Sequence, residues 1–444
     1  MEKAIQRQRV LLEHLQPISS SSNFSSQTHQ STDLSASLCF AGNSSHGQTG
    51  GSDDDVVIVA YNFSSITSAY RTAICKAKRG GFKDTLPDDL LATVLKAVIE
   101  KTNVDLRKLE ILSWAQYWHL DQIEELSAEW LPFMQVSQCS SGLQAVSDVA
   151  AYIKAGFYDI GIGAGLESMT VDRVNRLPNI NPKVETFAEA RDCLLPMGIT
   201  SENVAQRYGV TRLEQDQAAV ESHKRAAAAT AAGKFKEEII PVSTKFVDPK
   251  TGVEKKIIVS VDDGIRPNTN LADLAKLKPA FQKDGTTTAG NASQISDGAA
   301  AVLLMKRRVA VQKGLPILGI FRSFAAVGVD PAVMGVGPAV AIPAAVKSAG
   351  LELGNIDLFE INEAFASQYV YCLKKLGLDP RKVNVNGGAI ALGHPLGVTG
   401  ARCVATLLNE MKRGGKDCRF GVISMCIGDF FFWSLSISHI PVKS

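Results

Sequence analysis

Short unbroken apolar runs alternate with stretches of helical spacing along most of this chain. Residues 56–60 form a continuous apolar run, which is typical of a buried strand. Residues 90–101 repeat apolar positions at helical spacing, and residues 106–112 again have the pattern of a strand. A strand, a helix and a further strand in this order predict an α/β fold with mostly parallel sheets.

The same order of elements recurs in the second half of the chain, where a helix is predicted at 339–349 and a strand at 356–361. Gly142 and Gly400 each open a predicted helix that ends beside a glycine at the same offset. After each helix an aspartate, Asp159 or Asp417, precedes the next strand. We therefore predict a duplication, with two similar α/β halves packed against each other.

Three parts are predicted along the chain. Residues 1–52 are an N-terminal segment and linker, because residues 19–55 are dominated by Ser, Gln, Thr, Asn and Gly and are too polar to form a core. Residues 53–310 and 311–444 are the two halves. The stretch at about 166–287, with an Ala-rich helix at 214–232 and a turn at 262–264, is predicted to be an inserted loop domain over a site.

Composition excludes several classes of function. The 444 residues carry 47 basic and 45 acidic side chains, so there is no net field to bind nucleic acid or an anionic membrane surface. No apolar run reaches the roughly 18 residues that a membrane span needs. The 8 cysteines form no CxxC pair, and no motif with metal-ligand spacing is present, so neither a metal nor a disulfide framework is predicted.

Two thiols and one imidazole are candidates for chemistry. Cys139 lies immediately before a predicted helix, where the helix dipole and backbone N–H groups favour the nucleophilic thiolate. His394 lies between Gly393 and Pro395, an unusual setting for a histidine that only packs. Cys426 lies near the end of the strand that begins at residue 420. A thiol with a nearby imidazole base is the arrangement that acyl transfer needs.

Each candidate also has an ordinary structural explanation. A cysteine before a helix is more often a small buried hydrophobic residue, and Cys426 ends an apolar strand. The other histidines lie in the polar N-terminal segment, beside Lys224 on a polar helix, or in two segments of unusual sequence. His394 is therefore the candidate base.

Four motifs, read together, resemble the thiolases. They are Cys139 in CSSGLQA, Asn362 in Asn-Glu-Ala-Phe, His394 in Gly-His-Pro and Cys426 in Cys-Ile-Gly, in this order along the chain. Within that family the chain resembles plant peroxisomal enzymes that act on 3-ketoacyl-CoA. The resemblance implies two duplicated halves in a five-layered α-β-α-β-α sandwich, a loop domain that binds CoA, and a homodimer.

The implied reaction is cleavage of 3-ketoacyl-CoA by CoA, the last step of peroxisomal fatty-acid β-oxidation, with no cofactor beyond CoA as substrate. The resemblance implies that Cys139 forms the acyl-enzyme and that His394 accepts the proton of Cys139. It implies that Cys426 acts first as an acid and then as a base. It assigns one oxyanion hole to His394 with a water on Asn362, and the other to the N–H groups of Cys139 and Gly428. It also implies that Ser293 contacts the pantetheine arm of CoA.

Two further points concern oxidation and targeting. Cys193 lies in the inserted segment and is a candidate for a reversible disulfide with Cys139, although an isolated buried thiol is the more common case. The segment around Arg7, Gln8, His14 and Leu15 resembles the N-terminal nonapeptide that is read by the peroxisomal import receptor. Glu2 and Glu13 argue against a mitochondrial presequence, which is poor in acidic residues. In plant proteins of this kind the presequence is cleaved near a cysteine, here Cys39.

Three segments depart from the family pattern, namely 61–69, 110–137 and 429–444. We interpret them as altered splicing or a shifted reading frame, and we expect no clear strand before Cys139 and no ordinary last strand. Three alternative functions remain open at this point. They are a catalytically impaired thiolase-fold subunit, a biosynthetic acetoacetyl-CoA thiolase, and a condensing enzyme of the same fold, which would pair the cysteine with two histidines.

Overall fold

The computed structural model describes residues 52–59, 69–102, 104, 111–116, 134–135, 138–171, 186, 188–428 and 431–438. Residues 47–444 form a compact unit. The targeting segment with Arg7, Gln8, His14 and Leu15 lies outside the described residues, as does Cys39. The expectations about residues 1–51 therefore stay predictions.

Most strands belong to one 11-stranded sheet with the order β11-β12-β13-β10-β1-β9-β6-β4-β5, and β2 and β3 pair with β9. The strands of this sheet are β1 (Val56–Val59), β2 (Ala69–Arg71), β3 (Cys75–Lys76), β4 (Ile111–Gln116), β5 (Met134–Gln135), β6 (Ile160–Ser168), β9 (Ser296–Lys306), β10 (Ile317–Val327), β11 (Leu358–Ile361), β12 (Phe420–Gly428) and β13 (Phe431–Ser438). A separate hairpin pairs β7 (Val242–Val247) with β8 (Glu254–Val259).

The described helices lie on both faces of this sheet and in the segment between β6 and β9. They are α2 (Pro87–Thr102), α3 (Ser141–Ala155), α4 (Ala188–Asp192), α5 (Met197–Tyr208), α6 (Arg212–Ala231), α7 (Leu271–Ala275), α8 (Arg307–Gln312), α9 (Pro338–Ser348), α10 (Ala366–Leu376), α11 (Ala389–Leu392) and α12 (Leu396–Gly414). A 3-10 turn, η4 (Gln138–Ser140), precedes α3.

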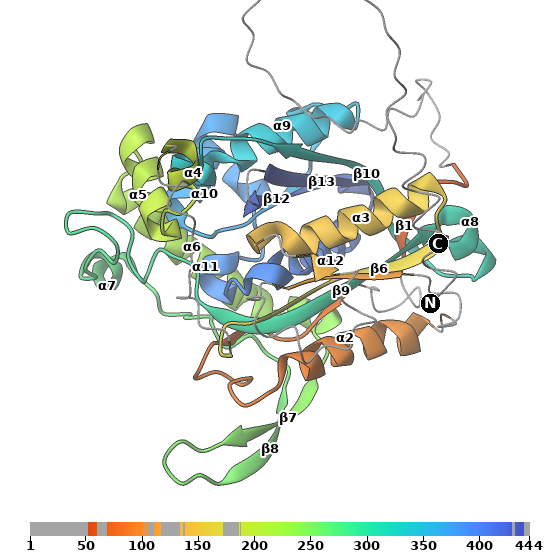
Figure 1. Ribbon diagram of the computed structural model, residues 1–444, viewed down its shortest axis with the longest axis horizontal. Coiled ribbons are helices and arrows are strands. Elements are labelled where there is room, and N and C mark those ends of the chain that lie inside the picture. Colours follow the sequence, from red (N-terminus) through yellow and green to blue (C-terminus); the bar gives the residue numbers. More distant parts are fainter. Residues whose placement is uncertain are drawn as a thin grey trace, which may run out of the picture. The chain divides into compact units, whose positions relative to one another are not determined.

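The helices and strands stack in five layers, which confirms the predicted sandwich (Figure 1). The strands of the two halves join where β1 pairs with β10. Between the two sets of strands lie α3 and α12, and α12 contacts β6 and β9 on one side and β11 and β12 on the other. The outer layers are α2, against β6 and β9, and α9, against β10, β12 and β13.

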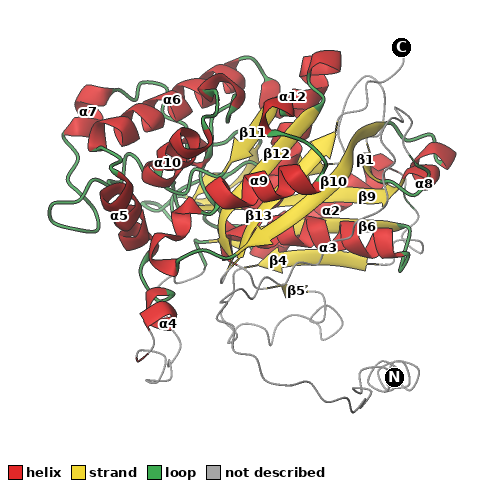
Figure 2. Cartoon of the chain, turned by 90° about the horizontal axis from the view of Figure 1, so that it is seen from above, coloured by secondary structure: helices red, strands yellow, loops and turns green. Residues whose placement is uncertain are grey.

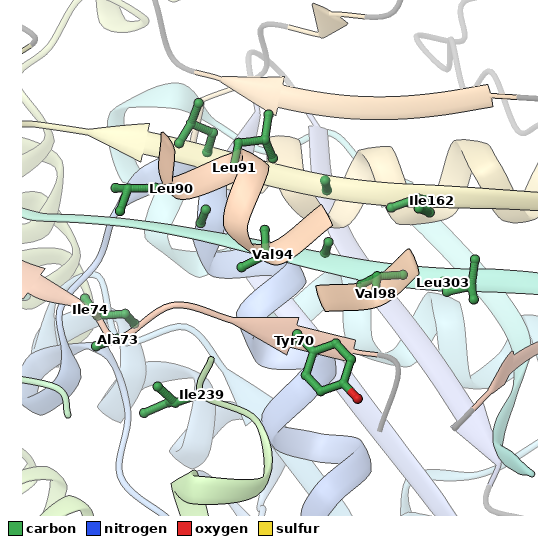
Figure 3. Close-up of a cluster of buried hydrophobic side chains, with 14 of the residues drawn as sticks. Tyr70, Ala73, Ile74, Leu90, Leu91, Val94, Val98, Ile162, Ile239 and Leu303 are labelled. Carbon is green, nitrogen blue, oxygen red and sulfur yellow. The ribbon is translucent and has the colours of Figure 1, made fainter. Parts of the chain in front are cut away.

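Three hydrophobic cores fill the spaces between these layers. Along β9, Leu303 (Figure 3) and Met305 belong to the core under α2, whereas Val302 and Leu304 belong to the core around α3 and α12. Successive side chains of a strand point to opposite faces, so a strand buried on both faces is apolar throughout. A third core lies between α9 and β11.

The predicted duplication is confirmed at the level of elements. In the first half β4 pairs parallel with β6, and in the second half β11 pairs parallel with β12. The parallel strand of each half is followed by an antiparallel neighbour, β9 beside β6 and β13 beside β12. The helices α2 and α9 come before these strands, and α3 and α12 come between them.

The expectation of mostly parallel sheets is wrong. The sheet has more antiparallel than parallel pairings, because β1, β9, β10 and β13 pair antiparallel with their neighbours. A continuous apolar run reports burial on both faces and carries no information on strand direction. The strand predicted at 106–112 overlaps β4 (Ile111–Gln116), and residues 106–110 lie outside the described part.

The expectations of no clear strand before Cys139 and no ordinary last strand are also wrong. β4 and β5 precede Cys139 and pair with each other, and β13 inserts between β12 and β10. Two neighbouring strands supply hydrogen-bond partners on both sides of β13, and its sequence FFWSLSIS has high strand propensity. The interpretation of these segments as altered splicing stays a prediction.

The inserted segment packs against the second half. Its helix α6 contacts α10 and α11 (Figure 1), and α5 contacts α10 (Figure 2). The stretch 262–264 has an anchoring role beyond the predicted turn. Asp262 is buried and accepts hydrogen bonds from Arg71 Nη1 at 2.7 Å and from the backbone N–H of Ile74 at 2.7 Å.

The central helices α3 and α12 cross at glycines. A Cβ atom on Gly142 would lie 2.4 Å from the carbonyl oxygen of Gly397, and one on Gly400 would lie 2.2 Å from the backbone nitrogen of Leu143. Gly165 of β6 lies equally close, since its Cβ would be 2.1 Å from the same oxygen of Gly397. Only glycine permits backbones to approach this closely.

Replacing Gly142 with alanine is expected to force the two central helices apart. We expect the free energy of unfolding to fall by about 1–3 kcal/mol, the usual cost of overpacking a core. Thermal or urea unfolding measures this change. The matched control is Gly354→Ala, because a Cβ at Gly354 meets nothing within 4 Å. Equal stabilities of the two variants would contradict the close crossing.

Candidate active site

Cys139 lies in η4, directly before α3, and its side chain is 7% exposed. It packs with Met334 and Ala341, and Leu396 at the start of α12 packs against the same group. The turn η4 contacts both α12 and β12. The nucleophile candidate therefore lies at the N-terminal end of α3, where the helix dipole favours a thiolate.

His394 lies between α11 and α12, and its backbone is fixed from both sides. Gly393 has φ of 113°, and a Cβ atom there would lie 2.2 Å from Ser296 Oγ, so glycine is required. The N–H of His394 donates to the carbonyl oxygen of Gln294 at 2.9 Å. The unusual Gly-His-Pro setting thus reflects a backbone that must pass close to β9.

Two hydrogen bonds orient the imidazole of His394. Nδ1 lies 2.6 Å from Thr399 Oγ1, and this hydroxyl donates to the carbonyl oxygen of Pro395 at 3.2 Å. Since the hydroxyl proton is directed at Pro395, the proton between the ring and Thr399 belongs to Nδ1. Asn362 Nδ2 lies 3.2 Å from Nε2 and is a donor, so both bonds assign the neutral ring with a lone pair on Nε2.

Burial keeps this imidazole neutral. The side chain is 4% exposed, and burial, with the positive charge of Arg402 as a second cause, lowers the pKa of His394 to about 3. Arg402, in α12, is paired with Glu360 at 3.2 Å. A neutral ring with a directed lone pair is the form in which a histidine accepts a proton.

Asn362 follows β11 and is held by its own backbone. Its N–H donates to the carbonyl oxygen of Ser424 in β12 at 2.9 Å, and its carbonyl accepts from Gln368 Nε2 at 2.8 Å. The side chain is 1% exposed. The structure thus brings together Asn362 and His394, which are distant in sequence.

Cys426 and Gly428 are described through the backbone of β12. This strand contacts η4, which carries Cys139, and it bonds to Asn362 through Ser424. The end of β12 is therefore placed beside the nucleophile candidate. The roles of Cys426 and Gly428 stay predictions.

Ser293 lies where the inserted segment returns to β9. Its N–H donates to the carbonyl oxygen of Ala364 at 3.0 Å, two residues after Asn362. The next residue, Gln294, accepts the N–H of His394. Ser293 thus lies on the chain segment that supports the imidazole, and its contact with CoA stays a prediction.

Cys193 lies in the turn between α4 and α5. Neither Cys193 nor Cys139 is in a disulfide bond in this structure, so their pairing stays a prediction. Within the described residues, no group of three potential ligands gathers to hold a metal ion. None of the described helices is long and apolar enough to cross a membrane.

Thr399 and Gln294 are site residues that sequence reasoning missed. A weak signal existed for Thr399, because it lies in the first turn of α12 and helical side chains point back toward the N-terminus. Gln294 supports His394 through a backbone carbonyl, which any residue type supplies. No sequence signal marks such a residue.

Comparisons with known proteins identify the family of the chain. A family profile described as Thiolase, N-terminal domain matches residues 64–308, and one described as Thiolase, C-terminal domain matches residues 315–431. The chain is 71% identical to 3-ketoacyl CoA thiolase 1, peroxisomal, of Petunia hybrida over 96% of this chain and 92% of that protein. It is 67% identical to 3-ketoacyl-CoA thiolase 2, peroxisomal, of Arabidopsis thaliana over the same shares of each.

The fold has solved counterparts as well. The dimeric peroxisomal thiolase of Saccharomyces cerevisiae matches with a TM-score of 0.79 and 44% identity, covering 88% of this chain and 99% of that one. The acetyl-CoA acetyltransferase of Bacillus anthracis matches with a TM-score of 0.75 and 33% identity, covering 87% of this chain and 99% of that one. Sequence and fold thus lead to one conclusion: the chain belongs to the thiolase family of acyltransferases.

Proposed function

We propose that this protein cleaves 3-ketoacyl-CoA with CoA to give acetyl-CoA and an acyl-CoA shortened by two carbons. The observation that carries the proposal is the buried, neutral imidazole of His394, whose Nε2 lies 3.2 Å from Asn362 Nδ2. His394 directly precedes α12, and α12 contacts the turn that holds Cys139. The names of the plant relatives support the choice of substrate.

The proposed chemistry has two halves. His394 accepts the thiol proton of Cys139, the sulfur attacks the 3-keto carbon, and the bond between C2 and C3 breaks. The electron pair stays on C2 as an enolate, and Cys426 protonates it to acetyl-CoA. In the second half Cys426 accepts the proton of the incoming CoA thiol, which attacks the acyl-enzyme and releases Cys139.

Oxyanions form on the 3-keto oxygen and on the acetyl thioester oxygen in turn. We assign one to the N–H groups of Cys139 and Gly428, and the other to protonated His394 with a water on Asn362. Each such donor contributes about 3–4 kcal/mol to the lowering of a barrier. The buried position of His394 strengthens these interactions, because little water competes.

A cationic cavity of about 540 Å³ supports CoA as substrate. Lys76, Arg79 and Arg266 line it, and none of them pairs with a described carboxylate. The carboxylate of Asp263 in its wall is bonded to the backbone N–H groups of Lys76 at 2.7 Å and Gly81 at 3.1 Å. Its charge is therefore already compensated, and the cavity favours an anion.

Residues 293–296 connect this cavity to the catalytic site. Gln294 accepts the N–H of His394 with its carbonyl and donates its side-chain Nε2 to the carbonyl oxygen of Gly264 at 2.9 Å. The carbonyl of Ile295 accepts the N–H of Ala77. We therefore place the pantetheine arm along this segment at Ser293, and the phosphates at the cavity.

The protein is peroxisomal, as its plant relatives are named. We propose that the nonapeptide with Arg7, Gln8, His14 and Leu15 binds the import receptor and that the chain forms a homodimer. The yeast thiolase of similar fold is dimeric, which supports the second point. An impaired subunit is less favoured, because β4, β5 and β13 all occur in the sheet around the site.

Loss of the Cys139 thiol is expected to abolish cleavage. In Cys139→Ala the rate of 3-ketoacyl-CoA loss, followed through the absorbance of its magnesium enolate, should fall at least about a thousandfold, since no acyl-enzyme forms. Cys418→Ala, which removes another buried thiol, is the matched control and should keep its activity. Turnover in Cys139→Ala would contradict the proposed nucleophile.

Removing one cation of the cavity is expected to weaken CoA binding. Lys76→Ala or Arg79→Ala should raise the KM for CoA about tenfold, the effect of losing about 1.5 kcal/mol from one charge-assisted bond. Pantetheine as the acyl acceptor should show no change, because it lacks the phosphates, and dephospho-CoA tests the 3′-phosphate. Lys96→Ala, on an exposed face of α2, is the control. An equal change for CoA and pantetheine would contradict this placement.

The dependence of kcat/KM on pH is expected to show no ionisation of an ordinary histidine on its acid side. Because the pKa of His394 is lowered to about 3, the neutral base persists as the pH falls from 8 to 5. The profile of kcat/KM reports groups of the free enzyme, so it should show no ionisation near 6.5. Circular dichroism checks that the protein stays folded. A limb centred near 6.5 that His394→Asn removes would show that the imidazole titrates normally.

A further inference from the structure

A buried carboxylate lies directly beside the catalytic asparagine. Glu363 follows Asn362 at the end of β11 and is 2% exposed. No step of the proposed chemistry uses it. A carboxylate is costly to bury, so its hydrogen-bond partners indicate what it does.

Three donors from separate segments converge on Glu363. Oε1 accepts from Asn384 Nδ2 at 2.9 Å. Oε2 accepts from Ser222 Oγ at 2.6 Å and from the backbone N–H of Ile390 at 3.2 Å. Ser222 belongs to α6 of the inserted segment, and Ile390 belongs to α11, which leads into Gly393 and His394.

Asn384 extends this contact back to the strand. It adopts a left-handed backbone with φ of 46°, and its side chain bonds to both the N–H and the carbonyl of Ile361, each at 2.8 Å. Its own N–H donates to the carbonyl oxygen of Phe359. Glu363 and Asn384 together therefore bind the loop before α11 to the end of β11.

The fit around the carboxylate is close. A Cβ atom on Gly388 would lie 2.2 Å from the carboxyl carbon of Glu363. The N–H of Gly388 donates to Ser222 Oγ at 3.2 Å, so this hydroxyl accepts from Gly388 and donates to Glu363. The chain just before His394 is thus held by backbone bonds at residues 388 and 390.

We propose that Glu363 is a positioning residue that sets the pair between Asn362 and His394. It holds the segment of His394 against the strand end that carries Asn362, and so it maintains the 3.2 Å approach of Asn362 Nδ2 to Nε2. This inference rests on the proposed function for its kinetic consequence, whereas the structural consequence is independent of it.

The donors require a carboxylate at this position. Asn384 Nδ2 and the N–H of Ile390 only donate, and they face different oxygens of Glu363. A glutamine has the same shape but one oxygen, so its NH₂ group must face one of these donors. Glu363→Gln therefore breaks at least one of these hydrogen bonds without removing packing volume.

The kinetic test compares Glu363→Gln with Glu410→Gln. Glu410 also accepts a bond from an asparagine, Asn386 at 2.9 Å, but it lies near the other end of α12, about 21 Å along the helix. We expect kcat of Glu363→Gln to fall about ten- to a hundredfold with KM within about twofold of wild type, since small misplacements cost this much. Glu410→Gln should keep the wild-type kcat.

A second readout does not depend on turnover. Amide hydrogen exchange of the peptide that contains α11 and His394 should be faster in Glu363→Gln than in wild type, and unchanged in Glu410→Gln. Ser222→Ala, which removes a single donor, should shift exchange and kcat in the same direction by a smaller amount. It serves as the test variant if Glu363→Gln does not fold.

The outcomes separate the two proposals. Faster exchange together with lower kcat supports the positioning role. Wild-type exchange and wild-type kcat in Glu363→Gln, or in Ser222→Ala where that is the test variant, would overturn it. An inactive wild-type protein would overturn the proposed function alone, and the exchange comparison would still decide whether Glu363 holds this segment.

Discussion

The close approach of α3 and α12 is the constraint on which the site depends. Both helices lie in the middle layer, and each begins beside a reactive group, Cys139 before α3 and His394 before α12. The crossing at Gly142 and Gly400 brings the backbones too close for any side chain. The duplicated halves thus meet through equivalent helices, and the two N-terminal ends place the thiol and the imidazole in one region.

Buried charge accompanies this arrangement. Arg402 of α12 pairs with Glu360 of β11, and Arg71 is bonded to Glu238 and Asp262. Such pairs are costly to bury and contribute little net stability, but removing one partner is strongly destabilising. The pair between Arg402 and Glu360 therefore fixes how α12 sits against β11, and the positive charge of Arg402 adds to burial in lowering the pKa of His394.

The duplication and two candidate site residues were predictable, because they depend on local sequence patterns. Equal glycine offsets revealed the duplication, and position relative to a helix or a proline singled out Cys139 and His394. Strand direction was not predictable, because a buried strand such as β9 is apolar in either direction. Asn362 and Ser293 were found only through family resemblance. Thr399, Glu363 and Gln294 act through individual hydrogen bonds to the His394 segment or its neighbours, and such bonds leave no periodic signal in the sequence.

The most direct test of this account is the alkylation rate of Cys139 by iodoacetamide at pH 7, measured on its peptide by mass spectrometry. A thiol activated by the helix end and by His394 should react faster than an ordinary thiol of pKa near 8.5. In Gly400→Ala, confirmed as folded by circular dichroism, the rate should fall toward that of an ordinary thiol. A wild-type rate in folded Gly400→Ala would contradict the claim that the glycine crossing aligns the site.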